Sequence, residues 1–101
     1  MAKLLSTDGT SKEIAPKNGK DFVLAELREL IGCEWIEVIY LNNSAYNDGD
    51  PNGDIMIGDE EARFNRNNTE NPEATKIYRK SWDTAQNIVG PIVLCKSKEL
   101  T

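Results

Sequence analysis

The sequence predicts an α+β fold: a single small domain with a largely antiparallel sheet of four to five strands and two packed helices. With 101 residues the chain can bury one modest hydrophobic core but not two. Five segments predicted to be strands interleave with two segments of helical periodicity, in the order β-β-α-β-β-α-β. We therefore expect one domain over residues 1–101, with a core at about 3–96 and a polar tail at 97–101.

The first elements are predicted to be a hairpin and a helix. Residues 3–6 and 11–14 flank an Asp-Gly pair at 8–9, which suits a tight turn. After a turn-rich connector, Asp21 is the expected N-cap of a helix that ends at Gly32 in the left-handed conformation. The spacing of the apolar residues places five of them on the inner face of this helix: Val23, Leu24, Leu27, Leu30 and Ile31.

Two strands are predicted next, joined by a long polar segment. Residues 34–41 are rich in β-branched and aromatic side chains, which predicts a strand with one deeply buried face. Residues 54–58 are its expected partner. By alternation Trp35 and Tyr40 lie on opposite faces of the strand. The favoured interpretation is that these side chains form and cover the core, rather than a binding platform.

A second helix and a last strand complete the domain. Asn71, Pro72 and Glu73 are typical of a helix start, with Asn71 as the N-cap. The helix is expected to run to about Trp82, and its inner-face candidates are Ala74, Ile77, Tyr78 and Trp82. Residues 88–95 form the expected final strand, with a Gly-Pro break near its start.

The residue types present limit the chemistry. The chain contains no histidine, which excludes Ser-His and Cys-His nucleophile pairs and most zinc sites. Cys33 and Cys95 lie far apart and are interpreted as small buried side chains. No apolar run is long enough for a membrane span or a signal peptide, so a cytoplasmic protein without a membrane partner is expected. No catalytic residue is predicted.

Charges are segregated along the chain, although the net charge is only −5. No basic residue occurs between Arg28 and Arg63, an interval with many acids, and the following segment is basic. An acidic face and a basic face are therefore expected. The candidate protein-interaction residues are Glu34, Glu37, Glu60 and Glu61; the candidate residues for a small anionic ligand are Arg63, Arg66, Lys76, Tyr78, Arg79 and Lys80.

One stretch matches a calcium-loop pattern. Within residues 48–59 the candidate metal ligands are Asp48, Asp50, Asn52, Asp54 and Asp59, arranged around a sharp turn at Gly53. The preceding segment predicts strand and loop rather than a helix, and Asp-Gly and Asn-Gly pairs also suit a hairpin loop. A plain solvated loop is the favoured interpretation, and a Ca²⁺ site is the alternative.

Four segments together resemble an uncharacterised family catalogued as domain of unknown function 3846. They are KNGKDFVLAELRELIGCEWIEVIYL, DIMIGDEEARFNRN, NPEATKIYR and NIVGPIVLC, and the resemblance covers roughly residues 12–96. It implies a setting in bacteriophages and other mobile elements, without an activity or a catalytic residue set. The chain departs from the family pattern in its long 42–53 loop, so the calcium-like motif is not implied by the resemblance.

These observations favour a small non-enzymatic binding protein of phage or mobile-element origin. It would counteract a host defence by sequestering an anionic, nucleotide-like ligand or by occupying a host protein. A ligand enclosed between subunits would make a homo-oligomer, and direct binding to nucleic acid is not expected. The alternative is a divalent-metal-binding domain, or a metal-dependent enzyme, built on residues 48–59.

Overall fold

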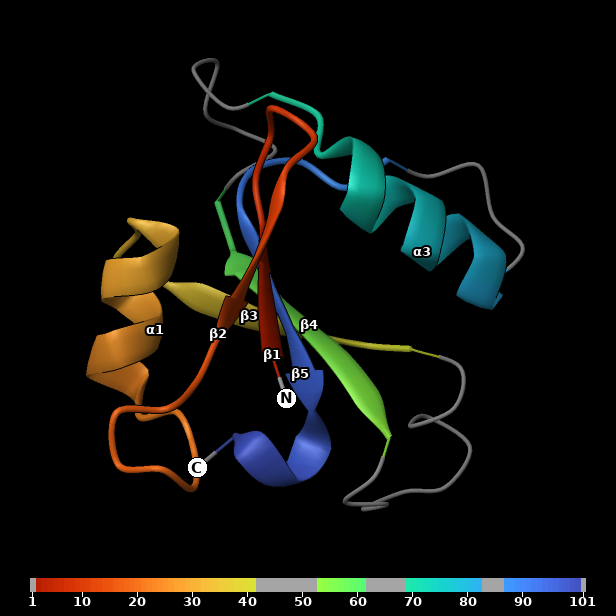
Figure 1. Ribbon diagram of the computed structural model, residues 1–101. Helices are drawn as coiled ribbons and strands as arrows, with labels where there is room; N and C mark the ends of the chain where they lie inside the picture. Colours follow the sequence, from red (N-terminus) through yellow and green to blue (C-terminus); the bar gives the residue numbers. More distant parts are fainter. Residues whose placement is uncertain (1, 42–52, 62–68, 83–86, 101) are drawn as a thin grey trace.

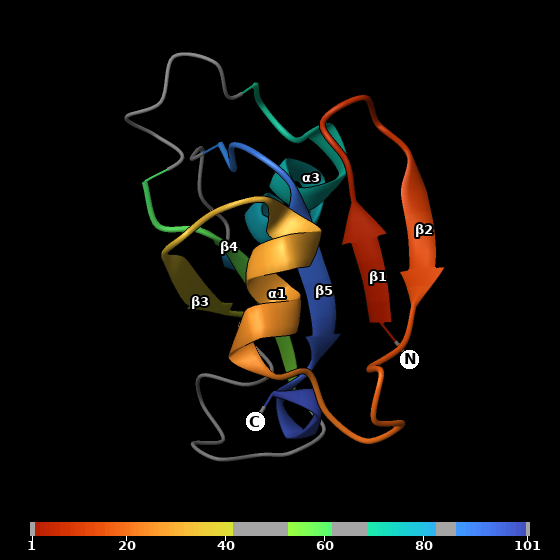
Figure 2. The same cartoon turned by 90° about the vertical axis from the view of Figure 1, so that its left-hand side faces the viewer.

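A five-stranded antiparallel sheet with one helix on each face forms the domain (Figures 1 and 2). The computed structural model describes residues 2–41, 53–61, 69–82 and 87–100. The strand order is β2-β1-β5-β4-β3. The predicted α+β class and the interleaved order are confirmed. The elements are β1 (Ala2–Leu5), β2 (Ser11–Ile14), α1 (Leu24–Ile31), β3 (Ile36–Tyr40), β4 (Asp54–Asp59), α3 (Pro72–Trp82), β5 (Ile92–Lys96) and the 3₁₀ turn η2 (Ser97–Glu99).

Alternation along the central strands creates a hydrophobic core on each face of the sheet. In β4, Ile55 and Ile57 face α1, whereas Met56 between them faces α3, and all three are fully buried. In β5, Val93 likewise faces α1 and Ile92 faces α3. The two helices are therefore packed against opposite faces of the sheet (Figure 2).

The first helix begins at Leu24, three residues after Asp21, the expected N-cap. Its N-cap is Val23, without a side-chain hydrogen bond, and Asp21 instead accepts a hydrogen bond from Asn18 Nδ2 at 2.8 Å. Phe22 is fully buried and its N–H donates to the Glu99 carbonyl at 2.6 Å. The prediction of Asp21 as the N-cap is wrong because this contact with the C-terminal segment holds Phe22 outside the helix.

The inner face of α1 also differs from the expectation. Val23 and Leu24 are 44% and 47% exposed, whereas Leu27 and Ile31 are buried as predicted. Glu26 is buried instead, and its carboxylate accepts the Lys17 N–H at 3.1 Å. The helix turns a carboxylate inward because the connector before it supplies a backbone donor.

Gly32 ends α1 in the left-handed conformation, as predicted. Its φ is 77° and its ψ is 37°, and its N–H donates to the Arg28 carbonyl. A Cβ at this position would meet no atom within 4 Å, so a side chain costs only backbone strain. We expect Gly32→Ala to lower the free energy of unfolding by about 1 kcal/mol and Gly32→Asn by clearly less. Urea denaturation of the two variants checks this, and equal losses would contradict it.

Residues 97–100 are not the polar tail that the sequence predicts. After β5 the chain forms η2, in which Glu99 is buried and its Oε1 accepts the Lys96 N–H at 2.9 Å. Leu100 pairs with Phe22 in an isolated parallel bridge. The polar composition of this segment misleads because the Glu99 side chain hydrogen-bonds to the backbone and Leu100 packs against the core.

The second helix begins as predicted, at Asn71. The Asn71 Oδ1 accepts the Ala74 N–H at 3.1 Å, which caps the helix. The same amide donates from Nδ2 to the carbonyls of Leu5 at 2.8 Å and Gly90 at 2.9 Å. Because Asn71 is fully buried, one side chain joins the start of α3 to β1 and to the segment before β5. The expected inner-face residues Ala74, Ile77 and Tyr78 pack against the core on this face.

The strand β3 is an edge strand, and this corrects its expected deep burial. It pairs with β4 in the predicted antiparallel manner, with Val38 opposite Ile57, but none of its residues is fully buried. Trp35 and Tyr40 are 54% and 53% exposed, so the interpretation as core and cover is wrong. An edge strand has a neighbour on one side only, and its side chains are correspondingly less covered.

Candidate functional site

The β3–β4 pairing gathers acidic residues at one end of the hairpin. The Glu60 N–H donates to the Trp35 carbonyl at 3.0 Å, and Ile36 lies opposite Asp59. Residues on either side of a long connection therefore meet. We call this cluster the acidic corner: Glu34, Glu37, Asp59, Glu60 and Glu61. Asp59 is half-buried and the other four are exposed. The four predicted protein-interaction residues all belong to it.

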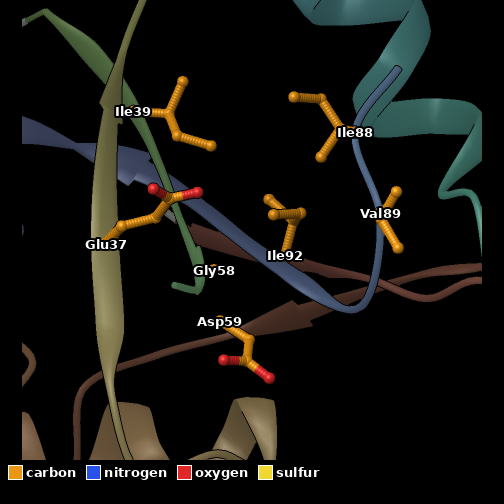
Figure 3. Close-up of a pocket in the computed structure, with 7 residues that line it drawn as sticks. All are labelled: Glu37, Ile39, Gly58, Asp59, Ile88, Val89 and Ile92. Atoms are coloured by element: carbon orange, nitrogen blue, oxygen red, sulfur yellow. The ribbon is translucent and has the colours of Figure 1, made fainter. Parts of the chain in front are cut away.

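A pocket lies beside the acidic corner, on the face of the sheet that carries α3 (Figure 3). The segment before β5 forms its opposite wall. Figure 3 shows Glu37 extending from β3 towards Ile92, whereas the Asp59 carboxylate points away from Glu37. Asp59 lies opposite Ile36, which packs on the α1 face, so Asp59 lines the pocket without directing its carboxylate into it. The interior measures about 10 Å³, room for about one water molecule. The lining residues are Glu37, Ile39, Gly58, Asp59, Ile88, Val89 and Ile92.

Gly58 shapes the floor of this pocket. A Cβ at Gly58 would lie 2.7 Å from Ile92 Cδ1, closer than real Cβ contacts allow. Glycine therefore lets the Ile92 side chain pass over β4. Sequence reasoning missed Gly58, Ile88 and Val89 as pocket residues. The only available signal was glycine inside a strand, which marks a close approach of another chain segment.

Burial and the charges beside the acidic corner lower the reactivity of the neighbouring Cys33 thiol. Burial raises the pKa of the Cys33 thiol, and the nearby Asp59 carboxylate raises it further, while Arg28 lowers it. The Cys33 Sγ donates to the Trp35 carbonyl at 3.4 Å. A thiol with a raised pKa holds little thiolate at neutral pH and is a weak nucleophile. The chemistry that this corner supports is binding of a cation by carboxylates next to an exposed indole.

The basic residues of α3 form a separate surface. Lys76, Arg79 and Lys80 are exposed and follow helical spacing along the outside of the helix, and we call them the basic helix face. Lys76 Nζ lies 4.0 Å from Glu73 Oε1, and Arg79 donates to Asn87 Oδ1. Neither hollow described in this section includes any of the three.

One predicted ligand-binding residue that the structure describes does not join the basic helix face. Tyr78 is half-buried against the core that α3 covers, so its ring does not offer the expected stacking surface. Arg63 and Arg66 lie outside the described residues. The anionic-ligand site as predicted is therefore not assembled by the residues that the structure describes.

Within the alternative Ca²⁺ interpretation, two of the candidate ligands cannot act together. Asp54 and Asp59 lie at opposite ends of β4, and six extended residues span about 16 Å. Calcium ligands lie within 2.3–2.6 Å of the ion, so these two carboxylates cannot share one. Asp54 also forms an ion pair with Lys96 Nζ at 2.6 Å. Asp48, Asp50 and Asn52 fall outside the described residues, in which no group of three acidic or cysteine side chains is placed to hold a metal.

A second hollow lies between the connector before α1 and the helix. Its volume is about 210 Å³, and Lys17 Nζ lies 3.7 Å from Glu29 Oε2 at its rim. Sequence reasoning missed it because the inward position of Glu26 depends on a tertiary contact. The lining residues are Lys17, Asn18, Val23, Ala25, Glu26 and Glu29. Charges of both signs line it, so it presents no single kind of binding partner.

Comparison of the chain with protein-family models, with curated proteins and with solved structures finds no match. The resemblance to domain of unknown function 3846 therefore stays a prediction. No helix within the described ranges is long and apolar enough to cross a membrane.

Proposed function

We propose that this chain is a non-enzymatic binding protein whose acidic corner occupies a basic surface of a partner protein. The observation that carries this proposal is the narrow pocket beside Glu37, at the end of the β3–β4 hairpin that also exposes Trp35. The pocket has apolar walls and the Glu37 carboxylate, and its size suits the ammonium group of a lysine side chain.

Three properties of the corner support a basic protein surface as the partner. Five carboxylates at one end of the β3–β4 hairpin favour association with positively charged partners and discriminate against acidic ones. Trp35 supplies a large side chain of the kind that anchors interfaces. Ile88, Val89 and Ile92 would contact the end of the lysine side chain while Glu37 binds its charge.

The geometry favours this mode over capture of a small anion. The basic helix face lies on the outside of α3, and a small anion needs converging donors around it. Tyr78 packs inward, and Glu73 beside Lys76 repels negative charge. The setting in phage counter-defence rests on the family resemblance alone, and in that setting the partner would be a host protein.

Titration with a tetralysine peptide, followed by amide chemical shifts, tests the binding mode. We expect shifts at residues 34–37, 59–61 and 88–89. Glu37→Gln with Glu60→Gln should weaken binding about tenfold, equivalent to about 1.4 kcal/mol, because the pocket carboxylate and an exposed carboxylate of the acidic corner are lost. The matched control is Lys76→Ala with Lys80→Ala, which should leave the affinity unchanged. Equal binding of the lysine-acetylated peptide, or shifts confined to α3, would contradict the proposal.

A further inference from the structure

The outer edge of β3 presents backbone groups that no described strand uses. β3 lies at one end of the strand order, next to β4 only. The Trp35 carbonyl accepts the Glu60 N–H at 3.0 Å, and the Leu41 N–H donates to Asp54 at 3.3 Å, so the odd-numbered residues face β4. Successive residues of a strand direct their backbone groups to opposite edges. Ile36 and Val38 therefore point theirs outward.

The two edges of the sheet differ in composition. The other edge strand, β2, has the sequence SKEI, with a lysine and a glutamate. Charges on an edge strand oppose pairing with another chain. β3 has the sequence IEVIY, in which Glu37 is the only charge, and Tyr40 is 53% exposed. Only the β3 edge has the composition of a strand that pairs.

We propose that a second copy of this chain pairs with β3 in antiparallel orientation, about a two-fold axis at Val38. This register overlaps all five residues of the strand. Val38 lies opposite Val38 of the second copy, and Ile36 lies opposite Tyr40. The backbone N–H and carbonyl of Val38 point away from β4. They therefore exchange two hydrogen bonds with the same groups of Val38 in the second copy. The sheet then continues through both copies.

In this register the side chains of β3 form favourable pairs with those of β3 in the second copy. Glu37 falls opposite the apolar Ile39 of the second copy. A register centred on Glu37 would bring two carboxylates directly opposite each other, which is destabilising. The exposed Tyr40 ring meets Ile36, an aromatic and β-branched pair of the kind that stabilises antiparallel strands. These pairs select a second copy over a strand of unrelated sequence.

A charge swap at Val38 tests both the dimer and its register. The mass of the wild-type chain in solution should rise from one copy to two between micromolar and millimolar concentration. Val38→Lys alone and Val38→Glu alone each bring like charges together, so each should weaken dimerisation about tenfold or more. Mixing the two variants should restore a dimer, because only this register places residue 38 opposite itself. The matched control is Glu13→Lys on the β2 edge, which should dimerise like the wild type.

Hydrogen exchange of the wild-type protein gives a second measurement that needs no variant. The Ser6 N–H donates to Thr10, so Glu13 in β2 directs its N–H outward, as Val38 does in β3. Exchange at Val38 should slow with protein concentration while exchange at Glu13 does not. A wild-type monomer at all concentrations, or a dimer unaffected by Val38→Lys, would overturn the proposal. Glu37 belongs to both surfaces, but either result leaves the proposed function standing, because tetralysine binding is measured separately on the same protein.

Discussion

Replacing Asn71 by alanine is expected to lower the free energy of unfolding by about 4 kcal/mol, a large share of the stability of a small domain. The substitution removes three hydrogen bonds at once, to Leu5, Gly90 and Ala74. Because Asn71 is fully buried, the two carbonyls and the amide that it leaves have little access to water. A buried polar group without a partner costs about 1–3 kcal/mol.

Asn18→Ala is the matched control for this prediction. Asn18 also makes three side-chain hydrogen bonds, to Asp21 Oδ1 and to the N–H groups of Lys20 and Asp21, but it is exposed. Water can replace those bonds, so we expect Asn18→Ala to cost about 1 kcal/mol or less. Urea denaturation at neutral pH measures both variants. Equal losses would show that burial of Asn71 does not decide its contribution.

Alkaline pH is expected to destabilise the fold through Cys95. Burial raises the pKa of this thiol to about 12, with smaller contributions from the charges of Glu99 and Asp54, against 9.0 for an ordinary thiol. Between these values the unfolded chain loses the thiol proton and the folded chain keeps it, so stability falls as pH rises. The loss is about 1.4 kcal/mol per pH unit above 9 and about 4 kcal/mol by pH 12.

Comparison with Cys95→Ala isolates this effect from the titration of other groups. The variant should be less stable than the wild type at pH 7, because it leaves a small cavity in the core. Above pH 9 its free energy of unfolding should fall less steeply, and the difference between the two pH profiles gives the contribution of Cys95. Urea denaturation from pH 7 to 11 measures both profiles. Parallel profiles would contradict a raised pKa at Cys95.

The elements that sequence reasoning predicted correctly depend on neighbouring residues. The left-handed Gly32 after α1 and the Asn71 cap of α3 are local backbone requirements, and they are met where expected. The pairing of β3 with β4 follows from two short apolar segments joined by a single connection. The grouping of acids between Arg28 and Arg63 likewise predicted an acidic surface, because the hairpin brings its two ends together.

The errors lie where residues distant in the chain meet. Phe22 leaves the helix because Glu99 accepts its N–H, a contact across most of the sequence. The burial of β3 depends on its place at the edge of the sheet, which the strand order decides and local composition does not. The pocket at the acidic corner requires Gly58 and Ile92 from neighbouring strands. Local patterns therefore define the elements of this protein, whereas its exposed edge and its pocket arise only when the sheet is assembled.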